Sequence, residues 1–229
     1  MARSHKLAAA LAASLSAPIA AQLAASMVLA LGACKSLDAP TPVLSESAVT
    51  LDLPIVRQDE LYDCGLAAIS ALCQYWSVEI PPERRSFLAA RAKEKEGLSG
   101  TELRETLEEL GLETFLFSGT LDRSETGLFR HVDAGRPLLV MLGTEKDSHH
   151  YCLFLGYDEP RKNTVLLDPA RGPVVRPLEV FARDWERCRR FTLLACPHGA
   201  DPAVSAPAGG VAGAPVSSTI AEARAAEKP

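Results

Sequence analysis

The apolar residues of the chain change their spacing once, between Gly111 and Thr114, and this change constrains the fold most strongly. Before it, apolar residues recur every three or four positions, the spacing of one helical face. After it, they gather in short runs typical of buried or half-buried strands. These runs are Thr114 to Phe117, Leu138 to Leu142, Tyr151 to Tyr157, Thr164 to Leu167 and Phe191 to Ala195. Helices that precede strands, without a regular β-α-β alternation, predict an α+β domain in which N-terminal helices pack on a C-terminal antiparallel sheet.

Three helices are expected in the first half of this domain. The first covers Cys64 to Trp76, with Asp63 as its N-cap. The second begins after Pro81-Pro82, where two prolines favour a helix start. The third follows Ser99, which together with Glu102 three residues later resembles a capping box.

The two ends of the chain differ from this central part in composition. Residues 198 to 229 are rich in Ala, Pro, Gly and Ser and contain no aromatic residue. Burial there cannot repay the entropy of ordering, so we predict a disordered tail. Residues 34 to 50 have no hydrophobic period and are predicted to form a linker. The folded domain is therefore expected to cover residues 51 to 197, enough chain for one core.

Residues 1 to 33 have the pattern of a secretion signal. Arg3 and Lys6 precede a long Ala- and Leu-rich run, which ends in Leu31-Gly32-Ala33-Cys34. This tetrapeptide resembles the bacterial lipoprotein box, so we expect cleavage before Cys34 and a lipid on its thiol. A membrane-spanning helix is the alternative, but Pro18 and Gln22 interrupt the run. A lipid of two or three acyl chains would tether the protein stably without spanning the bilayer.

Charge and flanking residues add expectations about location. The formal net charge is -5 and no window of five or six residues is strongly basic, which argues against a nucleic-acid partner. Lys35 after the lipid cysteine gives no signal for retention in the inner membrane. We therefore expect a cell-envelope protein anchored in the outer membrane, on its periplasmic face.

The residues most suited to chemistry lie in three separate segments. Cys64 opens the first helix, where unpaired backbone N–H groups and the helix dipole favour the thiolate. His150 opens one expected strand and Asp168 ends the next. Adjacent antiparallel strands would join these two as a base and the acid that orients it. Gln58, upstream of Cys64, offers a side-chain N–H to an oxyanion.

Together these segments resemble a known family. Gln-x-x-x-x-Asp-Cys-Gly from Gln58, His-Tyr at His150 and Asp-Pro-Ala-x-Gly from Asp168 are similar to the motifs of bacteriocin-processing, double-glycine leader peptidases. The resemblance covers nearly all of residues 54 to 197. It implies a papain-like fold, with Cys64 as nucleophile, His150 as base and then acid, Asp168 as orienting acid and Gln58 as oxyanion donor.

The resemblance predicts a membrane-tethered cysteine endopeptidase that cleaves a secreted peptide or protein. Many members of the family are fused to an ATP-driven exporter, so the resemblance leads us to expect a secretion-system partner. It also leads us to expect cleavage after two small residues. Both expectations rest on the resemblance alone. Two alternatives stay open at this point. One is a peptidoglycan-directed amidase or endopeptidase, and the other is a catalytically silent module that binds a peptide.

The remaining cysteines and histidines carry weaker expectations. Cys73 lies on the apolar helix face, and Cys152 should share the His150 side of its strand. Cys188 and Cys196 are candidates for a disulfide in an oxidising envelope. His149 competes with His150 for the role of base, but the motif favours the histidine directly before the aromatic residue. No Cys or His pairs have zinc-ligand spacing, so no metal site and no cofactor are expected.

Overall fold

The structure is a computed structural model that describes residues 43–143 and 148–199. The predicted signal peptide, the lipidation site Cys34, the first part of the linker and most of the C-terminal tail lie outside the described residues. None of the described helices is long and apolar enough to cross a membrane.

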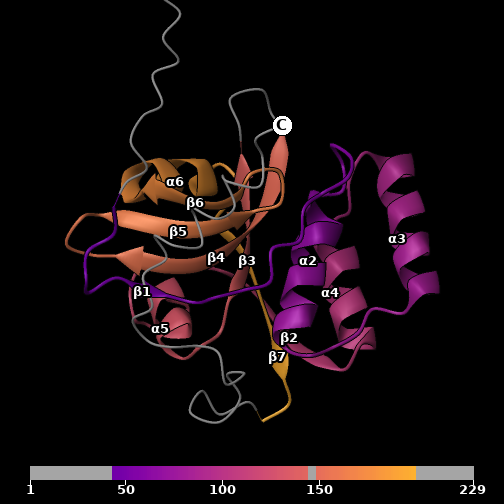
Figure 1. Ribbon diagram of the computed structural model, residues 1–229, viewed down its shortest axis with the longest axis horizontal. Helices are drawn as coiled ribbons and strands as arrows, with labels where there is room; N and C mark the ends of the chain where they lie inside the picture. The colour runs from indigo at the N-terminus through magenta and orange to yellow at the C-terminus, as the bar shows by residue number, and fades with distance from the viewer. Residues whose placement is uncertain (1–42, 144–147, 200–229) are drawn as a thin grey trace, which may run out of the picture. The chain divides into compact units, whose positions relative to one another are not determined.

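The described chain forms an antiparallel sheet with helices on both faces (Figure 1). The elements in chain order are β1 (Val49–Thr50), α2 (Cys64–Tyr75), α3 (Pro82–Lys95), α4 (Gly100–Glu109), β2 (Leu112–Ser118), α5 (Leu128–Asp133), β3 (Leu138–Gly143), β4 (His149–Asp158), β5 (Asn163–Asp168), β6 (Gly172–Pro177), α6 (Leu178–Glu186) and β7 (Phe191–Pro197). Helices α2 to α4 precede all but one short strand, so the expected α+β arrangement is confirmed.

The sheet separates two hydrophobic cores. Its strands follow the order β2-β7-β3-β4-β5-β6, and β1 pairs with β4. Because successive strand residues point to opposite faces, each central strand contributes to both cores. Leu139 and Leu153 pack on the side of α2 and α4, whereas Leu138 and Phe154 pack on the side of α5 and α6.

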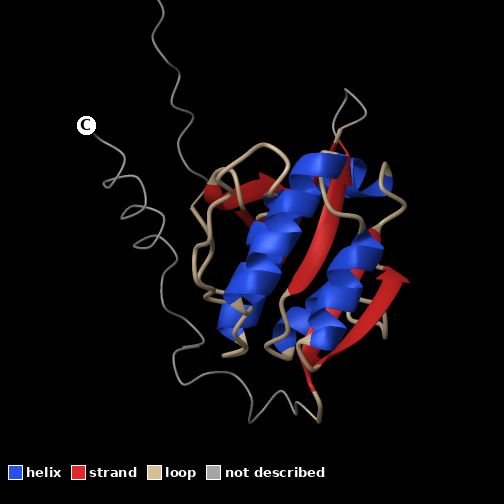
Figure 2. Cartoon of the chain, turned by 90° about the vertical axis from the view of Figure 1, so that its right-hand side faces the viewer, coloured by secondary structure: helices blue, strands red, loops and turns tan. Residues whose placement is uncertain are grey.

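Helix α2 is buried on almost every side, more than the single apolar face expected from its sequence. It packs against the sheet, α3 and α4. Helices α2, α3 and α4 form the helical layer in the foreground of Figure 2. Its one polar residue in mid-helix, Ser70, donates to the Leu66 carbonyl at 2.6 Å and accepts from Arg85 at 3.0 Å. The buried hydroxyl is therefore satisfied, as burial requires.

The fold begins earlier than the predicted boundary at Leu51. Val49 and Thr50 pair with the end of β4, and the Ser45 hydroxyl donates to buried Asp158 at 2.7 Å. The last residues of the predicted linker are thus part of the domain. Two residues of strand carry no detectable period, so only the contact with β4 reveals them.

Three further elements were not expected from the sequence. Strand β6 contains Pro173 and Pro177, which favour irregular structure, but it lies at a sheet edge where a missing N–H is tolerated. Helix α5 is only six residues long. Helix α6 carries Phe181 and Trp185 four positions apart, a helical signal that sequence reasoning overlooked.

The candidate disulfide between Cys188 and Cys196 is not formed, and every described cysteine is a free thiol. Cys188 follows α6 and its sulfur lies close to Gly143, at the end of β3. Cys196 lies near the far end of β7, opposite Glu113. Strand β7 rises about 3.3 Å per residue and so keeps the two sulfurs apart.

Candidate active site

Cys64 is the first residue of α2, as the sequence predicts, and its side chain is largely buried. The helix N-terminus leaves backbone N–H groups without helical partners there. Its sulfur lies close enough to the N–H groups of Gly65 and Tyr151 for both to stabilise the thiolate. The strand β4 thus approaches the nucleophile with backbone as well as side chain.

His150 and Asp168 meet across the pair of strands β4 and β5. His150 Nε2 and Asp168 Oδ1 lie 2.8 Å apart, and both side chains are partly exposed. The same Asp168 oxygen accepts the Ala170 N–H at 2.9 Å, which fixes the carboxylate in its turn. The expected contact between adjacent antiparallel strands is therefore present.

The electrostatics of the pair favour an ion pair between Cys64 and His150. Burial alone would raise the pKa of Cys64, but the hydrogen bond to His150 and the nearby backbone N–H groups lower it below the usual value. Burial alone would lower the pKa of His150, yet its hydrogen bonds to Asp168, Cys152 and Cys64 raise it well above the usual value. A thiolate beside an imidazolium is the form that attacks a carbonyl carbon.

Gln58 lies on the loop before α2, beside the loop that carries Asp168. Its backbone N–H donates to the Pro169 carbonyl at 3.0 Å, and its Nε2 donates to the Glu60 carbonyl at 2.9 Å. A side-chain amide carries two N–H hydrogens, and the bond to Glu60 uses one of those of Gln58. Its Oε1 is buried without a hydrogen-bond partner among the described residues.

Asp63 stands at the N-cap position of α2 but does not cap the helix, which corrects the expectation from sequence. Its side chain accepts no hydrogen bond from the first turn. One of its oxygens is buried without a partner among the described atoms, and burial raises the pKa of the carboxyl.

Cys152 shares the His150 side of β4, as the alternation of the strand predicts. It is 1% exposed and hydrogen-bonded to His150. His150, Cys152 and Asp168 place one metal-ligand atom each within 4.8 Å of one another. The imidazole and carboxylate already bond to each other, so we assign this cluster to orientation of the histidine and not to a metal. His149, the competing histidine, is exposed.

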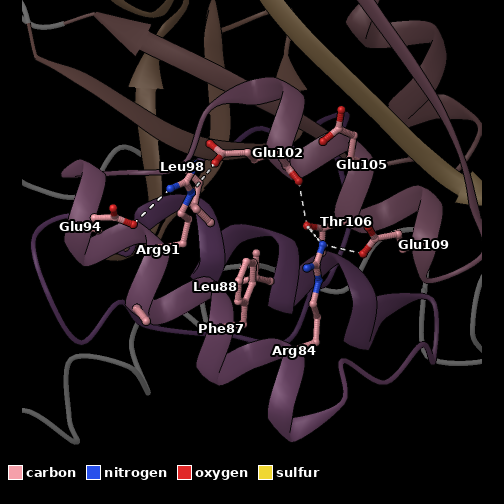
Figure 3. A pocket seen from close by; sticks show the side chains of 11 residues that line it. Arg84, Phe87, Leu88, Arg91, Glu94, Leu98, Glu102, Glu105, Thr106 and Glu109 are labelled. Atoms are coloured by element: carbon pink, nitrogen blue, oxygen red, sulfur yellow. Dashed lines mark hydrogen bonds and ion pairs between the residues drawn. The ribbon is translucent and has the colours of Figure 1, made fainter.

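A separate hollow lies between α3 and α4, with a volume of about 500 Å³ (Figure 3). Phe87 and Leu88 line its apolar part. Arg84 pairs with Glu109 at 2.5 Å, and Arg91 bonds to Glu102 at 3.0 Å. These charged side chains form ion pairs between the two helices, and none of the four candidate catalytic residues lines this hollow.

A thiol at a helix N-terminus, with an imidazole bonded to a carboxylate, is the nucleophilic arrangement of cysteine peptidases. The helical layer on an antiparallel sheet is the architecture that the papain-like resemblance implied for this class. Residues 52–194 match the model of the peptidase C39 family, which is more than half of the chain. The chain belongs to this family, and its resemblance to the double-glycine leader peptidases is confirmed.

One curated relative is the lactococcin-G-processing and transport ATP-binding protein LagD of Lactococcus lactis subsp. lactis. It is 25% identical over 131 residues, which are 57% of this chain and 17% of that protein. The chain thus spans about a sixth of the relative's length.

Two solved structures share the fold. A double glycine motif protease from an AMS/PCAT transporter, solved in complex with the leader peptide, has a TM-score of 0.52 and 19% identity and covers 68% of this chain and 99% of that one. The peptidase domain of Streptococcus ComA, from a bifunctional ABC transporter, has a TM-score of 0.51 and 20% identity and covers 66% and 99%.

Proposed function

We propose that this cysteine peptidase is a membrane-tethered endopeptidase that cleaves a secreted peptide or protein after a pair of small residues. The observation that carries the proposal is the bond between His150 and Asp168 beside a Cys64 thiol of lowered pKa. An assembled set of this kind favours catalysis over a silent binding module. One of the similar structures is a double glycine motif protease in complex with the leader peptide, which supports a double-glycine motif in the substrate.

The proposed reaction has two stages. The Cys64 thiolate attacks the carbonyl carbon of the scissile peptide, and Gln58 with the Cys64 N–H stabilises the oxyanion. The His150 imidazolium gives its proton to the departing amine, the C–N bond breaks, and a thioester remains. Neutral His150 then takes a proton from water, and the water oxygen attacks the thioester carbonyl carbon. The C–S bond breaks, the carboxylic acid is released, and the Cys64 thiolate is regenerated beside the His150 imidazolium. Asp168 keeps the imidazole in the orientation that both stages need.

The cleavage is tested with synthetic peptides in which a Gly-Gly pair precedes the scissile bond. Reduced, metal-free protein should release both fragments, detected by mass spectrometry, and the Cys64→Ala variant should release neither. A matched peptide with Val-Val in place of Gly-Gly should be cleaved far more slowly. Equal cleavage of the two peptides would overturn the small-residue preference. Release of soluble fragments from purified peptidoglycan, with inert peptides, would favour the amidase alternative.

The tether is proposed from the sequence alone, because Cys34 lies outside the described residues. The lipoprotein-like tetrapeptide ending at Cys34 supports it. We expect the mature protein to enter the detergent phase on phase partition and to sediment with outer-membrane vesicles. Cys34→Ala should move it to the aqueous phase while a purified sample keeps its peptidase activity. A Cys34→Ala protein that partitions like the wild type would overturn the lipid anchor.

A further inference from the structure

We infer that Arg57 is a positioning residue that holds the oxyanion donor Gln58 against the loop carrying Asp168. The inference rests on the proposed function, because it gives Gln58 its role. Arg57 directly precedes Gln58 on a segment that belongs to no helix or strand. Regular structure therefore does not fix the backbone that carries the donor, and specific contacts must do so.

Two neighbouring hydrogen bonds supply those contacts. Arg57 Nη1 donates to the Ala170 carbonyl at 3.0 Å, and the Gln58 backbone N–H donates to the Pro169 carbonyl at 3.0 Å. Both acceptors directly follow Asp168 in the chain. The pair thus fastens two consecutive residues of the Gln58 loop to two consecutive residues of the acid loop.

The acid loop is shaped to receive the guanidinium. Ala170 donates its N–H to Asp168 while its carbonyl accepts from Arg57. Gly172 has a φ of +81°, and a Cβ atom there would lie 3.1 Å from Nη2 of Arg57. Glycine therefore serves both the turn and the close approach of the planar guanidinium. One short loop thereby orients the acid on one side and the oxyanion donor on the other.

The expected effect of losing Arg57 falls on the transition state. An oxyanion donor contributes about 10²- to 10³-fold to kcat, and a displacement of about 1 Å in such a group can cost about 100-fold. We expect Arg57→Ala to lower kcat by about 10- to 100-fold with little change in KM. Arg57 is exposed, so its removal leaves no cavity in the core.

The test is a double-mutant cycle on peptide cleavage by the full chain. If Arg57 acts through Gln58, the Arg57→Ala/Gln58→Ala double variant should be no slower than Gln58→Ala alone. Arg57→Lys should restore part of the rate, because it retains a donor but not the planar fork. The pH dependence of Cys64 alkylation should be unchanged in Arg57→Ala, since the thiolate pair is intact.

Arg171→Ala is the matched control, because Arg171 is an exposed arginine of the same loop. It removes the same charge without touching the bond to Ala170. Equal losses in the Arg57 and Arg171 variants, or effects of Arg57→Ala and Gln58→Ala that multiply, would overturn the inference. A wild type that cleaves while Arg57→Ala cleaves equally well would overturn the inference alone. Cleavage that survives in Cys64→Ala, or is absent from the wild type, would overturn the proposed function as well.

Discussion

Helix α2 carries two cysteines whose chemistry differs because of their surroundings. Cys64 lies at its N-terminus, hydrogen-bonded to His150, and the pKa of its thiol is lowered despite burial. Cys73 is 1% exposed within the core, and burial raises the pKa of its thiol to about 12. A small apolar-like side chain packs well in either place. The position at the helix N-terminus and the contacts with β4 distinguish the candidate nucleophile from the structural thiol.

The first prediction concerns the pH dependence of Cys64 alkylation. Iodoacetamide should modify Cys64 with an apparent pKa below the ordinary thiol value of about 8.5. In His150→Ala the opposing effect of burial remains, so the pKa should rise above that value. Peptide mass mapping measures each thiol separately, and Cys73 serves as an internal control that stays unmodified. A low Cys64 pKa retained in His150→Ala would mean that the helix N-terminus, and not the histidine, sets it.

At the scale of single elements, local sequence and structure agree best in α4. Ser99 and Glu102 form the complete capping box that their spacing predicts. Glu102 also bonds to Arg91 and Lys95, so the N-terminus of α4 is joined to α3. Hydrogen bonds from Ser99 lead the causes that lower the pKa of Glu102 to about 2. A local motif thereby contributes to the packing of two helices.

The second prediction is a loss of stability in Ser99→Ala. Removal of an N-cap hydroxyl should lower the free energy of unfolding by about 1 kcal/mol at neutral pH. Because the pKa of Glu102 is depressed in the folded state, its stabilisation is present above the unfolded value and is lost as the pH falls toward about 2. Urea unfolding at neutral pH and near pH 2 measures the free energy of unfolding. The difference in this free energy between Ser99→Ala and the wild type should be smaller at the acidic pH.

Ser86→Ala is the matched control for this prediction. Ser86 is an exposed residue of α3 whose hydroxyl bonds only one turn back, to the Pro82 carbonyl. We expect a change within about 0.5 kcal/mol. An equal loss in the two variants would show that the capping box adds nothing specific.

The third prediction concerns the bulge of β4 near Gly156. A Cβ atom on Gly156 would lie 2.3 Å from the Val49 carbonyl oxygen, so Gly156→Ala must displace β1. We expect a loss of about 1–3 kcal/mol, as for other overpacked sites. Hydrogen exchange should accelerate at the Leu51 N–H, which bonds to the Leu155 carbonyl. Unchanged protection at Leu51 would mean that β1 does not depend on this close approach.

Across the described domain, one sheet packs against a hydrophobic core on each face. The candidate site lies where the sheet meets the helical layer on one of these faces. Cys64 comes from the helical layer on one face, whereas His150 and Asp168 come from the sheet itself. The chain before β1 joins this assembly through Ser45, whose N–H and hydroxyl both bond to Asp158 at 2.7 Å. Asp158 is fully buried, so its carboxylate needs hydrogen-bond donors, and Ser45 supplies two of them.

The fourth prediction follows from that contact. Burial opposes ionisation of Asp158, but hydrogen bonds led by Ser45 lower its pKa below the usual value. Ser45→Ala should therefore cost about 1.5–3 kcal/mol at neutral pH, the value of a hydrogen bond to a charged group. The cost should fall as the pH drops below about 3.9, where the unfolded chain already binds the proton. A cost that does not change with pH would contradict the ionised state of Asp158.

The sequence was sufficient wherever a property depends on neighbours a few positions away. The three helices, their order before the strands, the capping box at Ser99 and the thiol at the start of α2 all follow from local spacing. The motifs around Gln58, Cys64, His150 and Asp168 likewise pointed to the family. These features are local because the side-chain pattern repeats every three to four residues in a helix and every two residues in a strand.

Tertiary structure decided whatever depends on distances between remote segments. It paired β1 with β4, placed proline-containing β6 at an edge and kept Cys188 apart from Cys196. It also joined Arg57 and Gln58 to the acid loop and left Asp63 without a capping bond. Such contacts form only when the helices and the sheet pack together. Burial and hydrogen-bond satisfaction are properties of the packed chain and not of any short stretch of it.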